Sequence, residues 1–328
     1  MNEGMYYEGL EGKKVKCQLC PHQCLLKPGQ AGICRVRHNE DGTLYAANYG
    51  RVSSMNIDPI EKKPLYHFYP GSNILSVGTF GCNLSCPFCQ NYSIAHGTPK
   101  TYSIEPGDLC RLALEHRESS IGVAFTYNEP LIWYEYVIRA AQKIKEAGLK
   151  VVLVSNAFVQ PEPLKELLPF VDAVNFDVKA FNNEFYRKTC RGSLDIVKNN
   201  VELAVQKIHV EITNLLIPGD NDHPDEIASL AKWIAALNRA VPLHFSRYFP
   251  AYRFSKQSTA PGILEKARSI ALQYLHYVYL GNIAGQDNNT YCPVCGQLLV
   301  RREGYGVVIT GIADKKCRNC QRDIDFIL

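Results

Sequence analysis

The sequence has no hydrophobic run long enough to cross a membrane and no apolar core of a signal peptide. None of its runs reaches the roughly 18 consecutive apolar residues of a membrane span, and its first residues, MNEGMYYEGLEGKK, are mostly polar. It also lacks a long basic run, and its formal net charge is only +4, which argues against a nucleic-acid-binding surface. We therefore expect a cytoplasmic protein without membrane contact.

Cysteine, in contrast, is abundant, with 13 residues in a chain of 328. In a reducing cytoplasm these residues remain thiols, so metal binding explains their number better than disulfides do. Two isolated residues, Cys110 and Cys190, are typical of buried apolar side chains. The other cysteines form three groups: Cys17, Cys20, Cys24 and Cys34; Cys82, Cys86 and Cys89; and Cys292, Cys295, Cys317 and Cys320.

Short β-branched runs alternate with helical patterns between the second and third cysteine groups. The predicted strands are 74–80, 121–127, 150–156, 171–178, 207–217, 242–249 and 276–282. The predicted helices are about 105–118, 131–147, 161–168, 194–206, 223–238 and 261–274. This alternation predicts an α/β fold with a parallel sheet that curves into a full or partial barrel.

Polar or ionisable side chains follow seven successive predicted strands. In a parallel barrel the carboxyl ends of the strands carry the active site. Any one of these residues could simply end a strand or cap a helix, but seven in register predict a common site. They are Cys82, Cys86 and Cys89; Asn128 and Glu129; Ser155 and Asn156; Asp177 and Lys179; Glu211, Thr213 and Asn214; His244 and Arg247; and Asn282.

The cysteine loop after the first predicted strand, FGCNLSCPFCQNYS, has only three cysteines and no fourth nearby. A structural zinc site has four closed ligands, so three thiolates leave one position of a metal centre open. An open position is where a substrate or cosubstrate can bind.

The C-x3-C-x2-C spacing, with Phe88 before its last cysteine and with TYNEP, VSN and DVK at successive strand ends, resembles the radical S-adenosylmethionine (SAM) enzymes. The resemblance covers roughly residues 70–285 and implies a partial (β/α)6 TIM-like radical SAM barrel. It implies a [4Fe–4S] cluster on Cys82, Cys86 and Cys89, with SAM on the fourth iron.

The same resemblance implies a set of SAM-binding residues. Glu129 would bind the SAM amino group and Lys179 the carboxylate, although a solvated lysine at a helix start is the alternative for Lys179. Ser155 and Asn156 would bind the ribose. The full set is Phe88, Asn128, Glu129, Ser155, Asn156, Asp177, Lys179 and His244.

Within that superfamily the order of motifs is similar to the AmmeMemoRadiSam-system enzymes, a branch akin to pyruvate formate-lyase activating enzyme. The resemblance implies reductive cleavage of SAM to a 5′-deoxyadenosyl radical that abstracts hydrogen from an unidentified small-molecule or protein substrate. It implies an electron donor such as flavodoxin or ferredoxin, and Memo-like and AMMECR-like proteins as partners. The alternatives are a glycyl-radical enzyme activase and, in another class, a multi-zinc protein-binding module with a degenerate barrel.

The terminal cysteine groups predict two further metal sites and divide the chain. Two C-x2-C pairs separated by 21 residues suit a zinc ribbon or a rubredoxin-like iron site, with zinc the first choice. The N-terminal group, with His22 as an extra potential ligand, suits zinc or an auxiliary iron–sulfur cluster. We expect an N-terminal region at 1–70, the barrel at 71–285 and a four-cysteine domain at 286–328.

Overall fold

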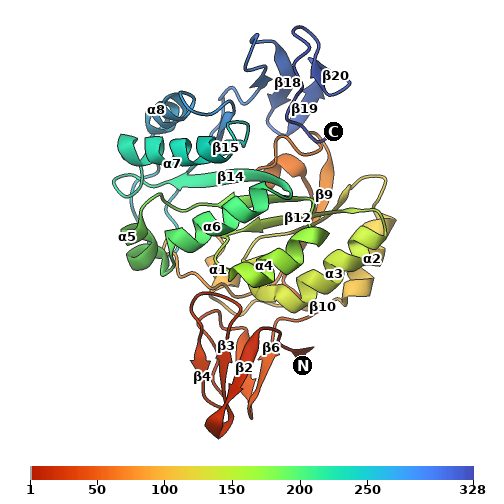
Figure 1. Cartoon of the computed structure of the whole chain (residues 1–328), viewed down its shortest axis with the longest axis vertical. Coiled ribbons are helices and arrows are strands. Elements are labelled where there is room, and N and C mark those ends of the chain that lie inside the picture. The colour runs from red at the N-terminus through yellow and green to blue at the C-terminus, as the bar shows by residue number, and fades with distance from the viewer. Residues whose placement is uncertain (1) are drawn as a thin grey trace.

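The computed structural model describes residues 2–328 and is built around one eight-stranded sheet (Figure 1). The sheet order is β16-β15-β14-β13-β12-β11-β9-β8, and every neighbouring pair from β9 to β16 is parallel. All seven predicted strands coincide with these parallel strands. They are β9 (Asn73–Gly78), β11 (Gly122–Phe125), β12 (Lys150–Ser155), β13 (Ala173–Asp177), β14 (His209–Leu216), β15 (Leu243–Arg247) and β16 (Val278–Gly281).

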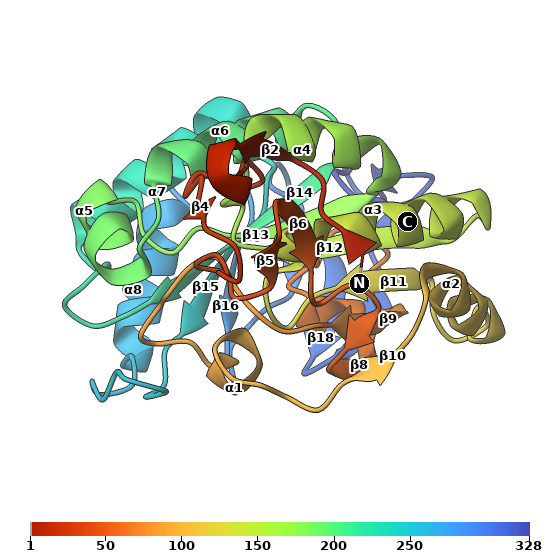
Figure 2. The same cartoon turned by 90° about the horizontal axis from the view of Figure 1, so that it is seen from below.

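Helices connect the parallel strands, as a parallel sheet requires. Seen from below, the longer helices follow one another along the outside of the curved sheet, and α1 lies apart from them (Figure 2). Six of them match the predicted segments, and α1 and α5 are short additions. The helices are α1 (Tyr92–Ala95), α2 (Pro106–Glu115), α3 (Tyr134–Glu146), α4 (Pro161–Leu167), α5 (Asn183–Phe185), α6 (Leu194–Val205), α7 (Pro224–Leu237) and α8 (Pro261–Ala271).

The sequence of α3 explains both its position and its end. Val137, Ala141 and Ile144 recur at helical spacing and are fully buried against the sheet. The helix ends before Gly148, whose φ of +76° is readily available to glycine and whose N–H donates to the Lys145 carbonyl at 2.9 Å. Gly148 therefore ends this helix.

The N-terminal region consists of short antiparallel strands at the lower end of the molecule in Figure 1. The next strand along the chain, β8 (Ser54–Pro59), lies inside the predicted N-terminal region at 1–70. It pairs antiparallel with β9, however, and so belongs to the central sheet. The other strands are β1 (Asn2–Glu3), β2 (Tyr7–Leu10), β3 (Lys14–Cys17), β4 (Leu25–Leu26), β5 (Arg37–Glu40), β6 (Thr43–Ala46) and β7 (Arg51–Val52), which pairs with β10 (Tyr102–Ser103).

The C-terminal four-cysteine domain lies at the other end of the molecule, above the sheet in Figure 1. It packs on the segment that leads into β9: the Phe326 ring stacks on His67 with centroids 3.9 Å apart, and Arg302 Nη2 donates to the Tyr66 carbonyl at 2.7 Å. Its strands are β17 (Thr290–Tyr291), β18 (Leu298–Glu303), β19 (Gly306–Ile309), β20 (Ile312–Ala313) and β21 (Lys316–Cys317). This domain therefore covers the amino ends of the parallel strands.

Short single turns complete the secondary structure. Four are 3-10 turns, η1 (Glu11–Lys13), η2 (Ile60–Lys62), η3 (Pro130–Trp133) and η4 (Leu168–Phe170), and one is a π-helical turn, η5 (Tyr186–Cys190). Across residues 2–328, none of the helices combines the length and the apolar character needed to cross a bilayer.

Candidate active site

The three-cysteine loop leaves the carboxyl end of β9 and is fixed by backbone hydrogen bonds on both sides. Gly81 N–H donates to the Ile94 carbonyl at 3.0 Å, and Ser85 N–H donates to the Cys190 carbonyl at 2.9 Å. Within the loop, Leu84 N–H donates to Cys82 Sγ at 3.4 Å. The loop, which we call the cluster loop (residues 79–91), therefore presents its cysteines in a fixed arrangement.

The surroundings of the cluster loop keep its three cysteines protonated unless a cation is bound beside them. Burial and the Glu129 carboxylate raise the pKa of Cys82 well above its ordinary value. A hydrogen bond with Cys190, together with burial, does the same to the pKa of Cys86, and burial raises the pKa of Cys89. Deprotonation of all three therefore calls for a bound cationic centre, which is what a metal cluster provides.

A cavity of about 380 Å³ opens directly beside the three thiols. It lies at the carboxyl ends of β11, β12, β13, β14 and β15, as the parallel sheet predicts. Seven of the eight predicted SAM-binding residues line it, together with the cysteines. These seven are Phe88, Asn128, Glu129, Ser155, Asn156, Asp177 and Lys179.

Glu129 is the most engaged of these side chains. Its carboxylate accepts hydrogen bonds from Leu131 N at 2.9 Å, Ser155 Oγ at 2.8 Å and Asn156 N at 2.8 Å. Burial nevertheless raises the pKa of Glu129 to about 7. The carboxylate therefore holds the end of β12 against the end of β11, and Asn156 in turn donates to Asn83 Oδ1 at 3.1 Å in the cluster loop.

Asp177 and Lys179 form an ion pair on the cavity wall. Burial alone would lower the pKa of Lys179, but the Asp177 carboxylate outweighs burial and raises this pKa above its ordinary value, so Lys179 stays protonated. The second carboxylate oxygen, Asp177 Oδ1, and the nearby Thr213 Oγ1 are buried with no hydrogen-bond partner among residues 2–328. A polar ligand in this cavity would satisfy both atoms.

Asn128 lines the cavity, and its side chain also binds the cluster loop. Its side-chain oxygen accepts from Thr79 N at 3.1 Å and its Nδ2 donates to the Gly81 carbonyl at 2.9 Å. Both ends of the amide are thus used to hold the cluster loop against the end of β11.

The structure does not bring His244 to this cavity, in contrast to the prediction. His244 is only the second residue of β15, and its Nε2 lies 2.6 Å from Glu211 Oε2, where both side chains are buried. The residue of β15 that lines the cavity is Ser246, two positions later on the same face of the strand. The prediction placed the cavity-lining residue of β15 two positions too early. Side chains alternate between the two faces of a strand, so Ser246 lies on the same face as His244 but nearer the carboxyl end.

Residues before β9 also contribute and were missed. Lys62 and Lys63 line the cavity, and Lys63 Nζ lies 2.7 Å from Asp58 Oδ2, while Tyr127 Oη donates to the same carboxylate at 2.8 Å. β8 runs antiparallel to β9, with Pro59 opposite Asn73, so Lys62 and Lys63 follow β8 at the amino end of β9 and reach the cavity from that side. Recognising β8 as a strand of the central sheet was the signal that could have found these lysines.

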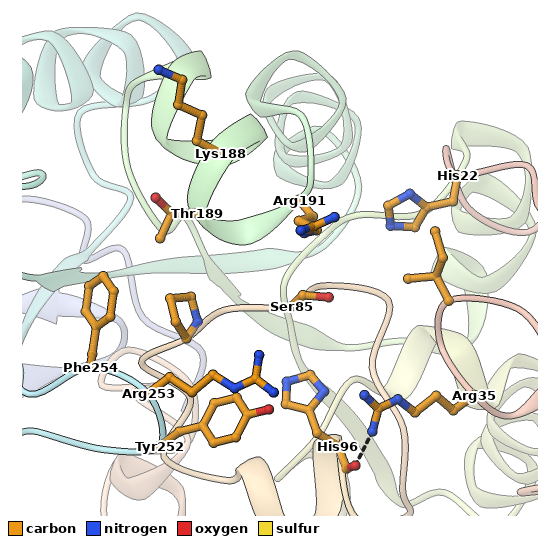
Figure 3. Close-up of a pocket in the computed structure, with 12 residues that line it drawn as sticks. His22, Arg35, Ser85, His96, Lys188, Thr189, Arg191, Tyr252, Arg253 and Phe254 are labelled. Atoms are coloured by element: carbon orange, nitrogen blue, oxygen red, sulfur yellow. Dashed lines mark hydrogen bonds between the residues drawn. The ribbon is translucent and has the colours of Figure 1, made fainter.

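A second cavity, of about 540 Å³, lies on the outer side of the cluster loop (Figure 3). Arg35, Arg191 and Arg253 line it without a carboxylate partner among the described residues. Arg35 donates to the His96 carbonyl, and burial, Arg35 and Arg253 together lower the pKa of His96. This cationic cavity suits an anionic group.

The predicted C-terminal metal site is confirmed as a cluster of thiols. The Sγ atoms of Cys292, Cys295, Cys317 and Cys320 all lie within 4.8 Å of one another. Two of the separations are 3.6 Å (Cys292–Cys320) and 3.7 Å (Cys295–Cys317). With about 2.3 Å between zinc and sulfur, a tetrahedral ion needs sulfur separations of about 3.8 Å, so the four thiols fit one ion.

The two isolated cysteines differ in their surroundings. Cys190 ends η5, is fully buried and contacts Cys86 of the cluster loop. Cys110 lies on α2 with partial exposure and donates to the Lys143 carbonyl at 3.4 Å. The expectation of a buried apolar role therefore fits Cys190 alone.

Comparison with known proteins agrees with this geometry. A family model of the radical SAM superfamily matches residues 76–231, which include the cluster loop and the ends of β11 to β14. The uncharacterized protein MJ0808 of Methanocaldococcus jannaschii is 39% identical over 338 residues, covering 100% of both chains. The (2S)-3-sulfopropanediol dehydratase activating enzyme of Klebsiella oxytoca is 29% identical over 120 residues, covering 36% of this chain and 38% of the relative.

Solved structures share the fold. SuiB of Streptococcus suis bound to S-adenosylmethionine has a TM-score of 0.51 and 12% identity, over 63% of this chain and 51% of that chain. The same protein bound to its precursor peptide SuiA has a TM-score of 0.52 and 13% identity, over 68% and 51%. At this level of identity the similarity describes the α/β fold and its central parallel sheet.

Proposed function

The chain belongs to the radical SAM superfamily, and from that premise we propose that it cleaves SAM reductively and uses the resulting radical to abstract hydrogen from a substrate. The observation that carries the proposal is the cavity in which Cys82, Cys86 and Cys89 face the Asp177–Lys179 pair. Three thiolates leave one iron of a [4Fe–4S] cluster without a protein ligand, and SAM can fill that position.

The bound cluster would supply one electron to the SAM sulfonium, releasing methionine and a 5′-deoxyadenosyl radical. The chain supplies the binding and orientation. Lys179 neutralises the methionyl carboxylate, while Asp177 Oδ1 and Thr213 Oγ1, both lacking partners among the described residues, can accept or share hydrogen bonds with SAM. Glu129 attracts the amino group and keeps Ser155 and Asn156 in place for the ribose.

The fold supports the finer expectations in part. We propose that the first six parallel strands, β9 to β15, with α2, α3, α4, α6, α7 and α8, correspond to the partial (β/α)6 barrel, and that β16 extends it. Radical SAM enzymes commonly take electrons from flavodoxin or ferredoxin, and we propose such a donor here. The motif order within residues 17–252, from CQLCPHQC through FTYNEP and IPGDND to HFSRYFPAY, supports the AmmeMemoRadiSam branch, with Memo-like and AMMECR-like proteins as partners.

A glycyl-radical enzyme activase is the second candidate. It is favoured by the local similarity to an activating enzyme over 36% of this chain.

The experiment that separates the candidates uses extract from cells grown in deuterated medium, divided by ultrafiltration into protein and small-molecule fractions. Reduced protein and unlabelled SAM should yield deuterated 5′-deoxyadenosine with one fraction. Label transfer from the protein fraction, with a glycyl radical signal, supports the activase; transfer from the small-molecule fraction contradicts it. Unlabelled product with both fractions would overturn hydrogen abstraction.

For the C-terminal site we propose one structural zinc ion. The four-cysteine domain has a small core, and domains of this size commonly depend on a bound ion for their fold. Cys295→Ser should release about one zinc per chain and expose residues 286–328 to protease, while SAM cleavage with a chemical reductant stays close to the parent rate. Protease resistance after complete metal removal would contradict the structural role.

A further inference from the structure

The N-terminal cysteines form a second buried group close to the cluster loop. Cys17, Cys20 and Cys34 are at most 8% exposed, and Cys17 N–H donates to the Cys24 carbonyl at 2.9 Å. Burial raises the pKa of Cys20 to about 12, with contributions from the other three thiols, which places all four near one another. A Cβ at Gly32 would lie 3.5 Å from Cys24 Sγ, so the chain between Cys24 and Cys34 closes over the group.

The spacing of these four thiols differs from that of the C-terminal site. Only the C-terminal group, among residues 2–328, has three or more potential ligand atoms all within 4.8 Å of one another. The N-terminal thiols are therefore more widely spaced, and so are Cys82, Cys86 and Cys89. Thiolates that bind separate corners of an iron–sulfur cube lie farther apart than thiolates that share one ion. The N-terminal thiols are thus not gathered around a single ion position, which leaves room for a larger centre such as an iron–sulfur cube.

The surroundings of the N-terminal thiols also suit an anionic cluster. Arg37 is 1% exposed, is paired with Glu135 at 2.7 Å, and its pKa is raised in part by Cys17 and Cys34, which places it beside both. Its Nε is buried without a hydrogen-bond partner among the described residues. A cluster sulfide or thiolate would satisfy this donor. Burial raises the pKa of Cys34, and the N–H groups of Val36 and Arg37, which point toward its sulfur, oppose that rise.

The N-terminal group lies directly against the cluster loop. His22 Nε2 is 2.7 Å from the Asn83 carbonyl, and a Cβ at Gly81 would lie 2.6 Å from the Cys34 carbonyl oxygen. His22 and Arg35 face Ser85 across the cavity of Figure 3. The C-terminal four-cysteine domain, in contrast, packs at the opposite end of the sheet. An electron relay therefore fits the N-terminal group and not the C-terminal one.

We propose that Cys17, Cys20, Cys24 and Cys34 bind a second [4Fe–4S] cluster, which passes one electron at a time to the cluster on Cys82, Cys86 and Cys89. A one-electron carrier of the flavodoxin or ferredoxin class reduces the second cluster from the 2+ to the 1+ state. Transfer to the first cluster returns it to 2+. The relay rests on the proposed function; the identity of the second cluster does not.

The test of identity leaves the N-terminal region unchanged. The variant Cys82→Ala/Cys86→Ala/Cys89→Ala is reconstituted anaerobically and compared with the parent and with Cys110→Ala as a matched cysteine control. We expect about eight iron and eight sulfide per chain in the parent and the control, and about four of each in the triple variant. After reduction, the triple variant should keep an EPR signal that SAM does not shift. A triple variant with no iron and an additional zinc ion would overturn the second cluster.

The test of the relay compares two reductants in the variant Cys24→Ser, whose substituted side chain is half-buried and keeps a similar volume. The rate of 5′-deoxyadenosine formation with reduced flavodoxin, divided by the rate with dithionite, should be at least tenfold lower in this variant than in the parent. An equal ratio in the variant and the parent would overturn the relay, while the iron count of the triple variant would still decide the identity of the cluster. If the parent protein does not cleave SAM with either reductant, the result contradicts the proposed function instead.

Discussion

Lys179 is the single residue whose charge the proposed SAM site depends on most. Its ammonium group faces the cavity from the end of β13, and the Asp177 carboxylate keeps it protonated. We predict that Lys179→Met weakens SAM binding to the cluster-loaded protein by roughly tenfold to a hundredfold, the value of a charge-assisted hydrogen bond of about 1.5–3 kcal/mol. Isothermal titration measures the change.

The matched control for this substitution is Lys165→Met, because Lys165 is exposed and paired only with Glu162 on α4. SAM affinity in this control should equal that of the parent. Equal affinity in Lys179→Met as well would mean that the methionyl carboxylate binds elsewhere.

Gly81 lies in the cluster loop, where the backbone of the N-terminal region packs closely against it. Its φ is +88°, and a Cβ would lie 2.6 Å from both the Cys34 carbonyl oxygen and Val36 Cγ1. We predict that Gly81→Ala displaces the cluster loop, lowers the iron bound by Cys82, Cys86 and Cys89, and costs about 1–3 kcal/mol of unfolding free energy. Iron analysis and thermal unfolding measure both effects.

Gly219→Ala separates backbone strain from the close contact. Gly219 has a similar φ of +74°, but no atom lies within 4 Å of the Cβ position. This variant should retain the iron content of the parent. If Gly81→Ala also binds iron normally, the close approach of the N-terminal region does not hold the cluster loop.

The strands and helices with a regular hydrophobic pattern were predictable from the sequence. The exact residue at which a strand ends was not. The β-branched runs at 150–156 and 171–178 are β12 and β13, because a buried parallel strand needs apolar residues on both faces. The strand β8, SMNIDP, has no such run and was missed; pairing with β9 defines it. His244 was misplaced because a run of apolar residues does not reveal where the strand ends.

At the scale of the whole molecule, the C-terminal domain is attached through a buried histidine. His67 stacks on Phe326, its Nε2 lies 2.7 Å from Tyr279 Oη, and burial lowers its pKa to about 3. The folded state therefore binds no proton there, whereas the unfolded chain binds one below about pH 6.5. Stability must fall as the pH drops through this window.

We predict that this residue alone removes about 2 kcal/mol of unfolding free energy between pH 6.5 and pH 5, at about 1.4 kcal/mol per pH unit. Urea unfolding at a series of pH values measures the slope. His67→Phe, which keeps an aromatic ring against Phe326, should lose that part of the slope, and the exposed substitution His116→Asn should retain it. A slope unchanged in His67→Phe would contradict the buried neutral histidine.

The positions of the two terminal regions could not be read from the sequence. The contacts that fix them join distant residues, His67 with Phe326 at one end and His22 with Asn83 at the other. Cysteine spacing predicted that both regions bind metal, yet it assigned neither to an end of the sheet. Their placement follows only from packing, which puts the N-terminal thiols beside the cluster loop and the C-terminal thiols at the opposite end of the sheet.

The central claim is that Cys82, Cys86 and Cys89 hold the cluster at which SAM is cleaved. The most direct measurement is 5′-deoxyadenosine formed from SAM by anaerobically reconstituted, dithionite-reduced protein, with the triple alanine variant at these positions beside it. The parent should release 5′-deoxyadenosine and methionine in equal amounts. The variant should release neither, while retaining the zinc of the C-terminal site as evidence that it is folded. Cleavage by the folded variant at the parent rate would contradict the account.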